Sequence, residues 1–237
     1  MVTQPKGLLL DYGGTLVEEV NFDPRAGNEA MLARANRWPE EVTLEKVTER
    51  ANKVEAEVKA RRDQFQLETP WSTLTRLIHE FLGIRFVDSM SELEMTFWKA
   101  SITTRPMPGA REALEEFHRR GVRIAVVSNC SFGQDVIRYE LAKHGLAERL
   151  EFVMVSSEYA VRKPNPLLFD TAAAKLGVKP KDVWFVGDRL DADVAGAKAA
   201  GMTAVWFCPS INERSDSPDM IVTGWAELVL KFQRAGQ

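Results

Sequence analysis

Several short apolar runs of this 237-residue sequence end in polar residues of types that can do chemistry together. The set comprises three aspartates, a serine with the asparagine that follows it, and a lysine: Asp11, Asp188, Asp193, Ser128, Asn129 and Lys163. Carboxylates are ligands that Mg²⁺ accepts in proteins, and hydroxyl and ammonium groups can orient the oxygens of a phosphate. Brought together, these side chains would hold a divalent cation and a phosphoryl group.

The apolar runs in front of these residues are typical of parallel strands that are buried on both faces. We predict strands at 6–11, 122–129, 152–157, 183–188 and 203–208, and helices at 108–120, 133–144, 165–176 and 191–200. Each of these helices is followed by a glycine, which commonly caps a helix C-terminus. The alternation predicts an α/β fold with a doubly wound, Rossmann-like parallel sheet. Chemistry in such a sheet collects at the carboxyl ends of the strands.

Residues 24–103 have a different pattern, a long helical block without a convincing strand. Helices are predicted at 26–37, 44–66, 69–83 and 88–101. The second places Val47, Ala51, Val54 and Val58 at the spacing of one buried helix face. We therefore expect a small helical bundle with no sheet of its own, inserted after the first strand. The predicted division is a core domain of residues 1–16 and 106–237, and an α-helical cap domain of residues 17–105.

Composition excludes several function classes. The net charge is −3, with 31 basic and 34 acidic residues, so nothing predicts a nucleic-acid partner. No apolar run approaches the roughly 20 residues that span a bilayer, and no leader is visible. Cys130 and Cys208 lack metal-site spacing, and His79, His118 and His144 lie far apart in the sequence. We expect a cytoplasmic protein with reduced cysteines and no membrane partner; its oligomeric state cannot be read from the sequence.

Four motifs resemble, in order, those of the haloacid dehalogenase-like (HAD) hydrolases. They are DYGGTL at 11–16, VVSN at 126–129, RKPNPLLF at 162–169 and VGDRLDADVAGAKAAG at 186–201. The segment PMPGAREAL at 106–114 resembles the family's return to the core, and the helical insertion resembles its α-helical cap. The resemblance covers the whole chain, and it implies a hydrolase that acts on a small phosphorylated molecule with Mg²⁺ as cofactor.

The resemblance also implies a role for each motif residue. Asp11 would attack phosphorus and become an aspartyl-phosphate, and Mg²⁺ would be held by Asp11, the Gly13 carbonyl and Asp188. The remaining roles are phosphoryl binding by Ser128, Asn129 and Lys163, support of Asp11 by Lys163, support of the metal site by Asp193, and bracing of the turn by Thr15. The chemistry is phosphoryl transfer, which a covalent intermediate divides into two steps.

One position departs from the family pattern. In the family's phosphatases, the residue two after the nucleophile is a second aspartate that protonates the leaving alcohol and later activates water. Here that residue is Gly13, which keeps its carbonyl for the metal but has no acid–base side chain. A positioned general acid–base contributes about 10²–10⁴ in rate. We therefore expect weak activity on alkyl phosphates, a preference for good leaving groups such as acyl or aryl phosphates, and retained metal binding.

Three alternatives stay open. A phosphonatase-like enzyme would form a Schiff base on a cap lysine, for which the candidates are Lys46, Lys53 and Lys59. A dehalogenase-like enzyme would work without Mg²⁺, against which the intact acidic motif stands. A non-catalytic ligand-binding protein on the same scaffold would explain the lost acid differently.

The cap is expected to choose the substrate. Just past the nucleophile turn lie Glu18, Glu19 and Asn21, where the resemblance implies that the hinge enters the cap, and one of the two glutamates could replace the missing acid. Arginines could meet an anionic substrate and tryptophans could line an apolar pocket, although surface charge and core packing explain them more simply: Arg34, Arg37, Arg61, Arg62, Trp38, Trp71 and Trp98.

Overall fold

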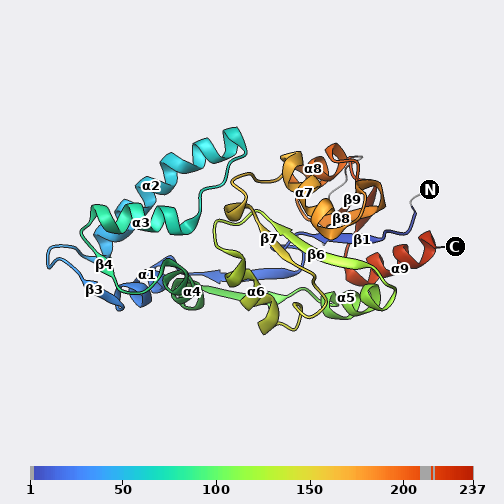
Figure 1. Cartoon of the computed structure of the whole chain (residues 1–237). Helices are drawn as coiled ribbons and strands as arrows, with labels where there is room; N and C mark the ends of the chain where they lie inside the picture. Colours follow the sequence, from blue (N-terminus) through green and yellow to red (C-terminus); the bar gives the residue numbers. More distant parts are fainter. Residues whose placement is uncertain (1–2, 209–214, 216, 237) are drawn as a thin grey trace.

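A parallel sheet forms the centre of the larger part of the molecule, to which both ends of the chain belong (Figure 1). The computed structural model describes residues 3–208, 215 and 217–236. In this part of the chain, six parallel strands lie in the order β10-β9-β8-β1-β6-β7. Their bounds are β1 Gly7–Leu10, β6 Arg123–Ser128, β7 Val153–Val155, β8 Val183–Gly187, β9 Thr203–Phe207 and β10 Met220–Val222. The predicted doubly wound α/β fold is confirmed, and all five predicted strands are present.

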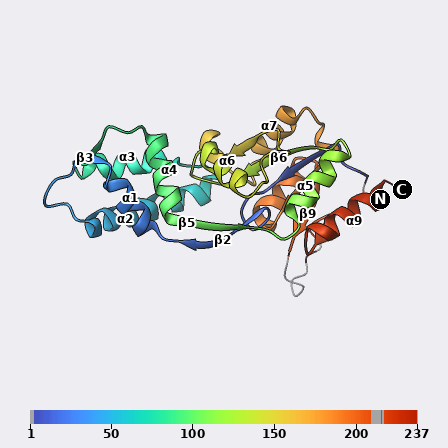
Figure 2. The ribbon, with the colours of Figure 1, turned by 90° about the horizontal axis from the view of Figure 1, so that it is seen from below.

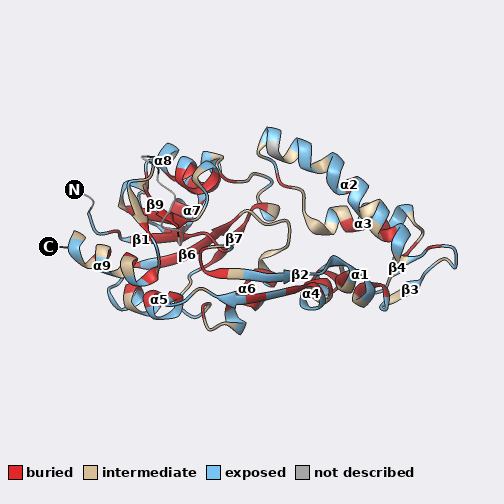
Figure 3. Cartoon of the chain, turned by 180° about the vertical axis from the view of Figure 1, so that it is seen from behind, coloured by how far each residue is buried: buried red, intermediate tan, exposed pale blue. Residues whose placement is uncertain are grey.

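Helices cover both faces of the sheet because side chains alternate along each strand. Leu8 and Leu10 of β1 pack into one apolar core cluster, and Leu9 between them packs into the other. The first cluster contains residues of α5 (Ala110–Arg119), α6 (Gln134–Lys143) and α9 (Trp225–Ala235). The second contains residues of α7 (Pro166–Leu176) and α8 (Ala195–Ala199). Figure 3 shows the buried strands between these helices.

The helix predicted at 191–200 is built in two parts. A π-helical turn at Leu190–Val194 precedes α8, and it positions Asp193 of the acidic motif. The glycine caps are confirmed most directly at Gly177, where the chain leaves α7 in the left-handed conformation with φ 67°.

The inserted region carries four helices, as predicted, but also strands. The helices are α1 Pro24–Leu32, α2 Leu44–Phe65, α3 Trp71–Phe81 and α4 Met90–Ser101. Strand β2 (Val17–Phe22) pairs antiparallel with β5 (Ile102–Pro106), and the short strands β3 (Ala35–Arg37) and β4 (Arg85–Phe86) pair in the same way. Figure 2 shows the β2–β5 ribbon reaching from the sheet to the helices.

The predictions of a strand-free block and of a helix over 26–37 were therefore wrong. The α1 helix ends at Leu32, and residues 35–37 belong to β3. The cause is pairing across the chain: β3 and β4 are three and two residues long, and each gains its hydrogen bonds from a distant partner. The boundaries at 16/17 and 105/106 stay a prediction, which the position of the ribbon supports.

The helices of the insertion bury one another's apolar faces. Val47 and Val54 of α2 are buried in a cluster with Leu32, Ile78 and Ile84, and Ala51 and Val58 pack partly against it. The opposite face of α2 is exposed (Figure 3). Among the described residues, no helix is both long enough and apolar enough to cross a membrane.

Candidate active site

Three neighbouring strands deliver the predicted site residues to one edge of the sheet. Leu10 is in register with Val126 on β6 and with Val186 on β8, so these strands end side by side. Asp11, Ser128 and Asp188 stand at or just beyond these strand ends. This edge is where open parallel sheets bind ligands.

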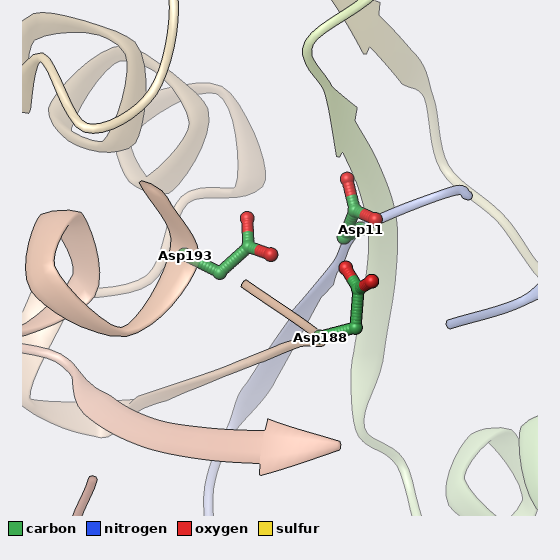
Figure 4. Close-up of side chains that lie close together, drawn as sticks. All are labelled: Asp11, Asp188 and Asp193. Atoms are coloured by element: carbon green, nitrogen blue, oxygen red, sulfur yellow. The ribbon is translucent and has the colours of Figure 1, made fainter. Parts of the chain in front are cut away.

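The three aspartates converge. Oxygens of Asp11, Asp188 and Asp193 all lie within 4.8 Å of one another, and Figure 4 shows the carboxylates turned toward a common space. Asp193 reaches this space from the π-helical turn, where its Oδ2 accepts a hydrogen bond from the backbone N–H of Arg189 at 3.0 Å. In the described part of the chain, no other group of acidic, histidine or cysteine side chains gathers in this way.

The buried Lys163 binds the aspartates from one side. Its Nζ donates to Asp11 Oδ1 at 2.5 Å and to the Val127 carbonyl at 3.0 Å, and it lies 2.7 Å from Asp193 Oδ1. A lysine has three N–H donors, so these contacts use its full capacity. Burial alone would lower the pKa of Lys163, but the charges of Asp11 and Asp193 outweigh it and raise that pKa above its ordinary value. Lys163 therefore remains a cation.

Asn129 holds the backbone of Lys163 rather than facing the aspartates. Its Oδ1 accepts from the Lys163 N–H at 2.7 Å, and its Nδ2 donates to the Lys163 carbonyl at 2.9 Å. This reciprocal pair fixes the lysine, which favours a positioning role over the predicted contact with phosphate. Ser128, which precedes it, is buried at the wall of the crevice.

The site carries more negative than positive charge. When all three carboxylates are ionised, the ammonium group of Lys163 balances one of them and leaves two negative charges uncompensated. Burial raises the pKa of Asp11 to about 7, an effect that Lys163 opposes and the other two aspartates reinforce. Burial and Asp193 likewise raise the pKa of Asp188. A divalent cation supplies the missing charge and prefers carboxylate oxygens, so the residues present fit Mg²⁺.

Two glycines give the carboxylates room. Gly14 has φ +74°, and a Cβ there would overlap the carboxylate of Asp188. A Cβ on Gly187 would overlap that of Asp193. At Gly14, only glycine combines this left-handed angle with such a close approach. The preceding glycine of the nucleophile motif, Gly13, meets neither condition.

Gly13 is the position that needs no glycine. It is exposed in the crevice, its backbone lies outside the left-handed region, and a Cβ built on it would meet nothing within 4 Å. The turn around it is closed by the Leu16 N–H, which donates to the Tyr12 carbonyl at 2.9 Å. Thr15 is buried beneath, and its carbonyl accepts from Trp225 Nε1 at 3.0 Å. The structure thus leaves space for an acid where the sequence has none.

A crevice of about 410 Å³ opens over the aspartates. Glu19, Glu68, Arg62 and Trp98 line it from the inserted region. The proposed Schiff-base lysines are exposed and are absent from its described walls: Lys46, Lys53 and Lys59. Several other residues considered for the cap also lie away from the crevice. Glu18 pairs with Arg105, and Arg34 pairs with Asp88. Arg37 lines a separate pocket, and the described crevice walls do not include Asn21, Arg61 or Trp38. Cys130 lines the crevice as a thiol, because burial raises its pKa to about 12.

A short strap joins the inserted region to the chain next to Lys163. The Glu68 N–H donates to the Ala160 carbonyl and the Arg162 N–H to the Gln66 carbonyl, both at 3.0 Å. Glu68 also accepts from Ser156 Oγ at 2.8 Å and lies 3.4 Å from Arg162 Nη1. Sequence reasoning missed this strap, because no local pattern marks a pairing between segments this far apart.

A buried glutamate makes a second attachment. Glu140 of α6 accepts from Trp98 Nε1 at 3.0 Å and from the Thr104 hydroxyl, and His144 and Lys143 lie beside it. Trp98 and Thr104 both line the crevice, so this carboxylate fixes part of its wall. The signal was weak in the sequence, where Glu140 resembles any charged residue of a surface helix.

A family model described as haloacid dehalogenase-like hydrolase matches residues 5–201. The chain belongs to this family. The predicted resemblance is thereby confirmed, and the converging aspartates and Lys163 lie on the family motifs identified in the sequence.

Similar proteins include both phosphatases and dehalogenases. This HAD-like chain is 34% identical to a phosphoserine phosphatase of Thermus thermophilus over 141 residues, which are 59% of this chain and 56% of that protein. The chain spans about half the length of the curated relatives it matches. A HAD phosphatase from Thermococcus onnurineus superimposes with a TM-score of 0.66 at 23% identity, covering 97% of this chain and 98% of that one. A 2-haloacid dehalogenase from Pseudomonas syringae gives 0.67 at 22%, covering 99% of both chains, so this likeness defines the fold alone.

Proposed function

We propose that this HAD-like hydrolase is a Mg²⁺-dependent phosphohydrolase that acts on a small phosphorylated metabolite through an aspartyl-phosphate on Asp11. The observation that carries the proposal is the contact of the Asp11 carboxylate with Lys163, beside Asp188 and Asp193. A relative named as a phosphatase supports the same class of reaction. Asp11, Asp188 and the Gly13 carbonyl would hold Mg²⁺, with Asp193 as support; bound Mg²⁺ neutralises charge on the phosphoryl oxygens.

The residues then divide the reaction into two displacements. An Asp11 oxygen forms a bond to phosphorus while the bond to the leaving oxygen breaks, and the leaving group departs with the bonding electrons. Water next attacks the aspartyl-phosphate at phosphorus, and the bond from phosphorus to the Asp11 oxygen breaks, which releases the Asp11 carboxylate and dihydrogen phosphate carrying both protons of the water. The Ser128 hydroxyl and Lys163 donate to the phosphoryl oxygens, and Lys163 exchanges one of its three present partners to do so.

The side chain missing at Gly13 shapes the substrate preference. Without a general acid at this position, the leaving group departs as an anion, so acyl and aryl phosphates react far better than alkyl phosphates. The space over Gly13 agrees with this account, because a Cβ built there meets no atom of the described residues within 4 Å.

The test is a substrate screen of the purified protein with and without Mg²⁺. We expect turnover of acetyl phosphate and 4-nitrophenyl phosphate with Mg²⁺, little turnover of glycerol 3-phosphate, and none in Asp11→Asn. Halide release from 2-chloropropionate without Mg²⁺ would establish a dehalogenase instead. Turnover of phosphonoacetaldehyde that borohydride blocks would establish a phosphonatase.

Trapping of the phosphoryl mimic beryllium fluoride separates a weak enzyme from a binding protein. With Mg²⁺, the mimic should bind to wild-type protein and not to Asp11→Asn, as followed by calorimetry. Binding of the mimic without turnover of any phosphate would favour the non-catalytic alternative.

A further inference from the structure

A second cavity, of about 380 Å³, lies among the helices of the inserted region. It shares four wall residues with the crevice over the aspartates, namely Phe22, Arg62, Ser131 and Phe132. We call this second cavity the cap chamber. Its walls include Phe22, Ala51, Trp71, His79, Phe97 and Phe132. Because the walls are shared, the cap chamber lies directly beside the crevice that holds Asp11.

Aromatic rings form one continuous wall of the cap chamber. Trp71 and Phe132 stack at 5.7 Å between ring centroids, and Phe97 lies 5.2 Å from Trp71 and 6.0 Å from Phe132. Phe22, on the β2–β5 ribbon, meets Phe97 edge to face at 6.4 Å. Phe22 is 46% exposed although it lies at the junction of two cavities. An exposed apolar surface beside the proposed active site is suited to bind an apolar group of a ligand.

A polar atom without a partner stands at the side of the cap chamber. His79 of α3 is 3% exposed and lies in the walls of both this cavity and the separate pocket that Arg37 lines. Its Nδ1 has no hydrogen-bond partner among the described residues. Burial lowers the pKa of His79 to about 4, so the ring is neutral at neutral pH. Buried polar atoms are nearly always satisfied, so this nitrogen is suited to a polar group carried by a ligand.

We propose that the substrate is an aryl phosphate, whose aromatic leaving group occupies the cap chamber between Phe22, Trp71 and Phe132 and whose far edge carries a polar substituent that reaches His79. This inference rests on the proposed function and narrows its substrate class. Two independent features converge on it. The cap chamber offers aromatic contact, and Gly13 requires a leaving group that departs without an acid, as a phenolate does.

The experiment compares 2-naphthyl phosphate with phenyl phosphate in the presence of Mg²⁺. Both release phenols of similar acidity, so the second ring is the main difference. We expect kcat/KM to be about tenfold or more higher for the naphthyl ester, the size of effect that an added apolar group gives in a fitted pocket. Equal values for the two esters would overturn the proposal.

A filled-chamber variant locates the effect. Ala51→Phe places a ring in the cap chamber from α2, and Ala60→Phe places the same ring on the exposed face of the same helix. The naphthyl-to-phenyl ratio should fall to about one in Ala51→Phe and should hold in Ala60→Phe. A folded Ala51→Phe protein, with a circular dichroism spectrum like the wild type, that keeps the full ratio would also overturn the proposal.

Binding measurements keep this test separate from the proposed function. Benzylphosphonate and 2-naphthylmethylphosphonate cannot be hydrolysed at a leaving oxygen, and calorimetry with wild-type protein and Mg²⁺ compares them without turnover or a variant. Tighter binding of the naphthyl compound by about tenfold supports the cap chamber even if no phosphate is hydrolysed. Failure of hydrolysis alone refutes the proposed function, whereas equal binding of the two phosphonates refutes the chamber assignment.

Discussion

Gly13→Asp is expected to raise turnover of alkyl phosphates about 10²–10⁴-fold, the contribution of a positioned general acid–base. This gain equals about 3–5 kcal/mol of activation free energy. The structure permits the substitution, because a Cβ at Gly13 meets nothing within 4 Å and the backbone there is not left-handed. The three aspartates nearby would raise the pKa of the new carboxyl group, which helps it to stay protonated and act as an acid.

The assay measures kcat/KM, which reports the step in which the leaving group departs, for glycerol 3-phosphate and for a series of aryl phosphates whose phenols differ in pKa. In the wild type, log kcat/KM should fall steeply as the leaving-group pKa rises, and Gly13→Asp should flatten this line. Mg²⁺ affinity, measured by calorimetry, should stay nearly constant because the carbonyl of residue 13 remains. Gly13→Asn is the matched control, since it adds the same volume without an acid.

One result would refute the missing-acid reasoning. If folded, Mg²⁺-binding Gly13→Asp gains nothing over Gly13→Asn on alkyl phosphates, another group already supplies the proton. A flat leaving-group dependence in the wild type would point the same way. Glu19 lines the crevice and would then be the first residue to test, as Glu19→Gln.

Three further predictions concern two residues of the candidate site and one buried glutamate. Gly14→Ala should weaken Mg²⁺ binding tenfold or more (roughly 1.4 kcal/mol), because its Cβ would overlap the Asp188 carboxylate; an unchanged Kd in calorimetry would remove that carboxylate from the metal site. Lys163→Met should lower the free energy of unfolding by about 3–5 kcal/mol, since buried carboxylates lose their partner; urea unfolding should show part of this loss restored by Mg²⁺, and wild-type stability would contradict the ion pairs. Burial raises the pKa of Glu94 from 4.5 to about 7, so its stabilising contribution is complete below pH 4.5 and is lost as pH rises through 7. Glu94→Gln keeps an acceptor for the Gly133 N–H and should exceed the wild type in stability by about 1–3 kcal/mol above pH 7. Thermal unfolding across pH checks this, and a difference that does not vary with pH would contradict it.

The core sheet could be predicted because its strands are buried on both faces. Such strands consist almost entirely of apolar residues, as in VWFVG of β8, and they end abruptly in polar ones. Parallel pairing then brings those ends together, which is why the sequence alone could place Asp11, Ser128 and Asp188 at one edge. The charged strand β2, in which Glu18 is half-buried and Glu19 is exposed, gives no comparable signal.

The walls of the site could not be predicted in the same way. Glu68 meets Arg162, and Glu140 meets Trp98, only through pairings between distant segments. Each residue is individually ordinary for its local element, a glutamate near a helix end or on a helix. The aromatic lining of the cap chamber has the same property, because tryptophan and phenylalanine at helical spacing equally suit a solid core.

The β2–β5 ribbon has a consequence for how readily the inserted region can be replaced. Val17 pairs with Pro106, so the chain departs from the sheet and returns to it at adjacent points. A segment whose two ends meet can be exchanged, lengthened or shortened with little disturbance to its host, as insertions between neighbouring termini generally are. If the inserted region selects the substrate, as we expect, a helical unit transplanted from another member of the family should change the substrate while leaving the residues at the sheet edge in place.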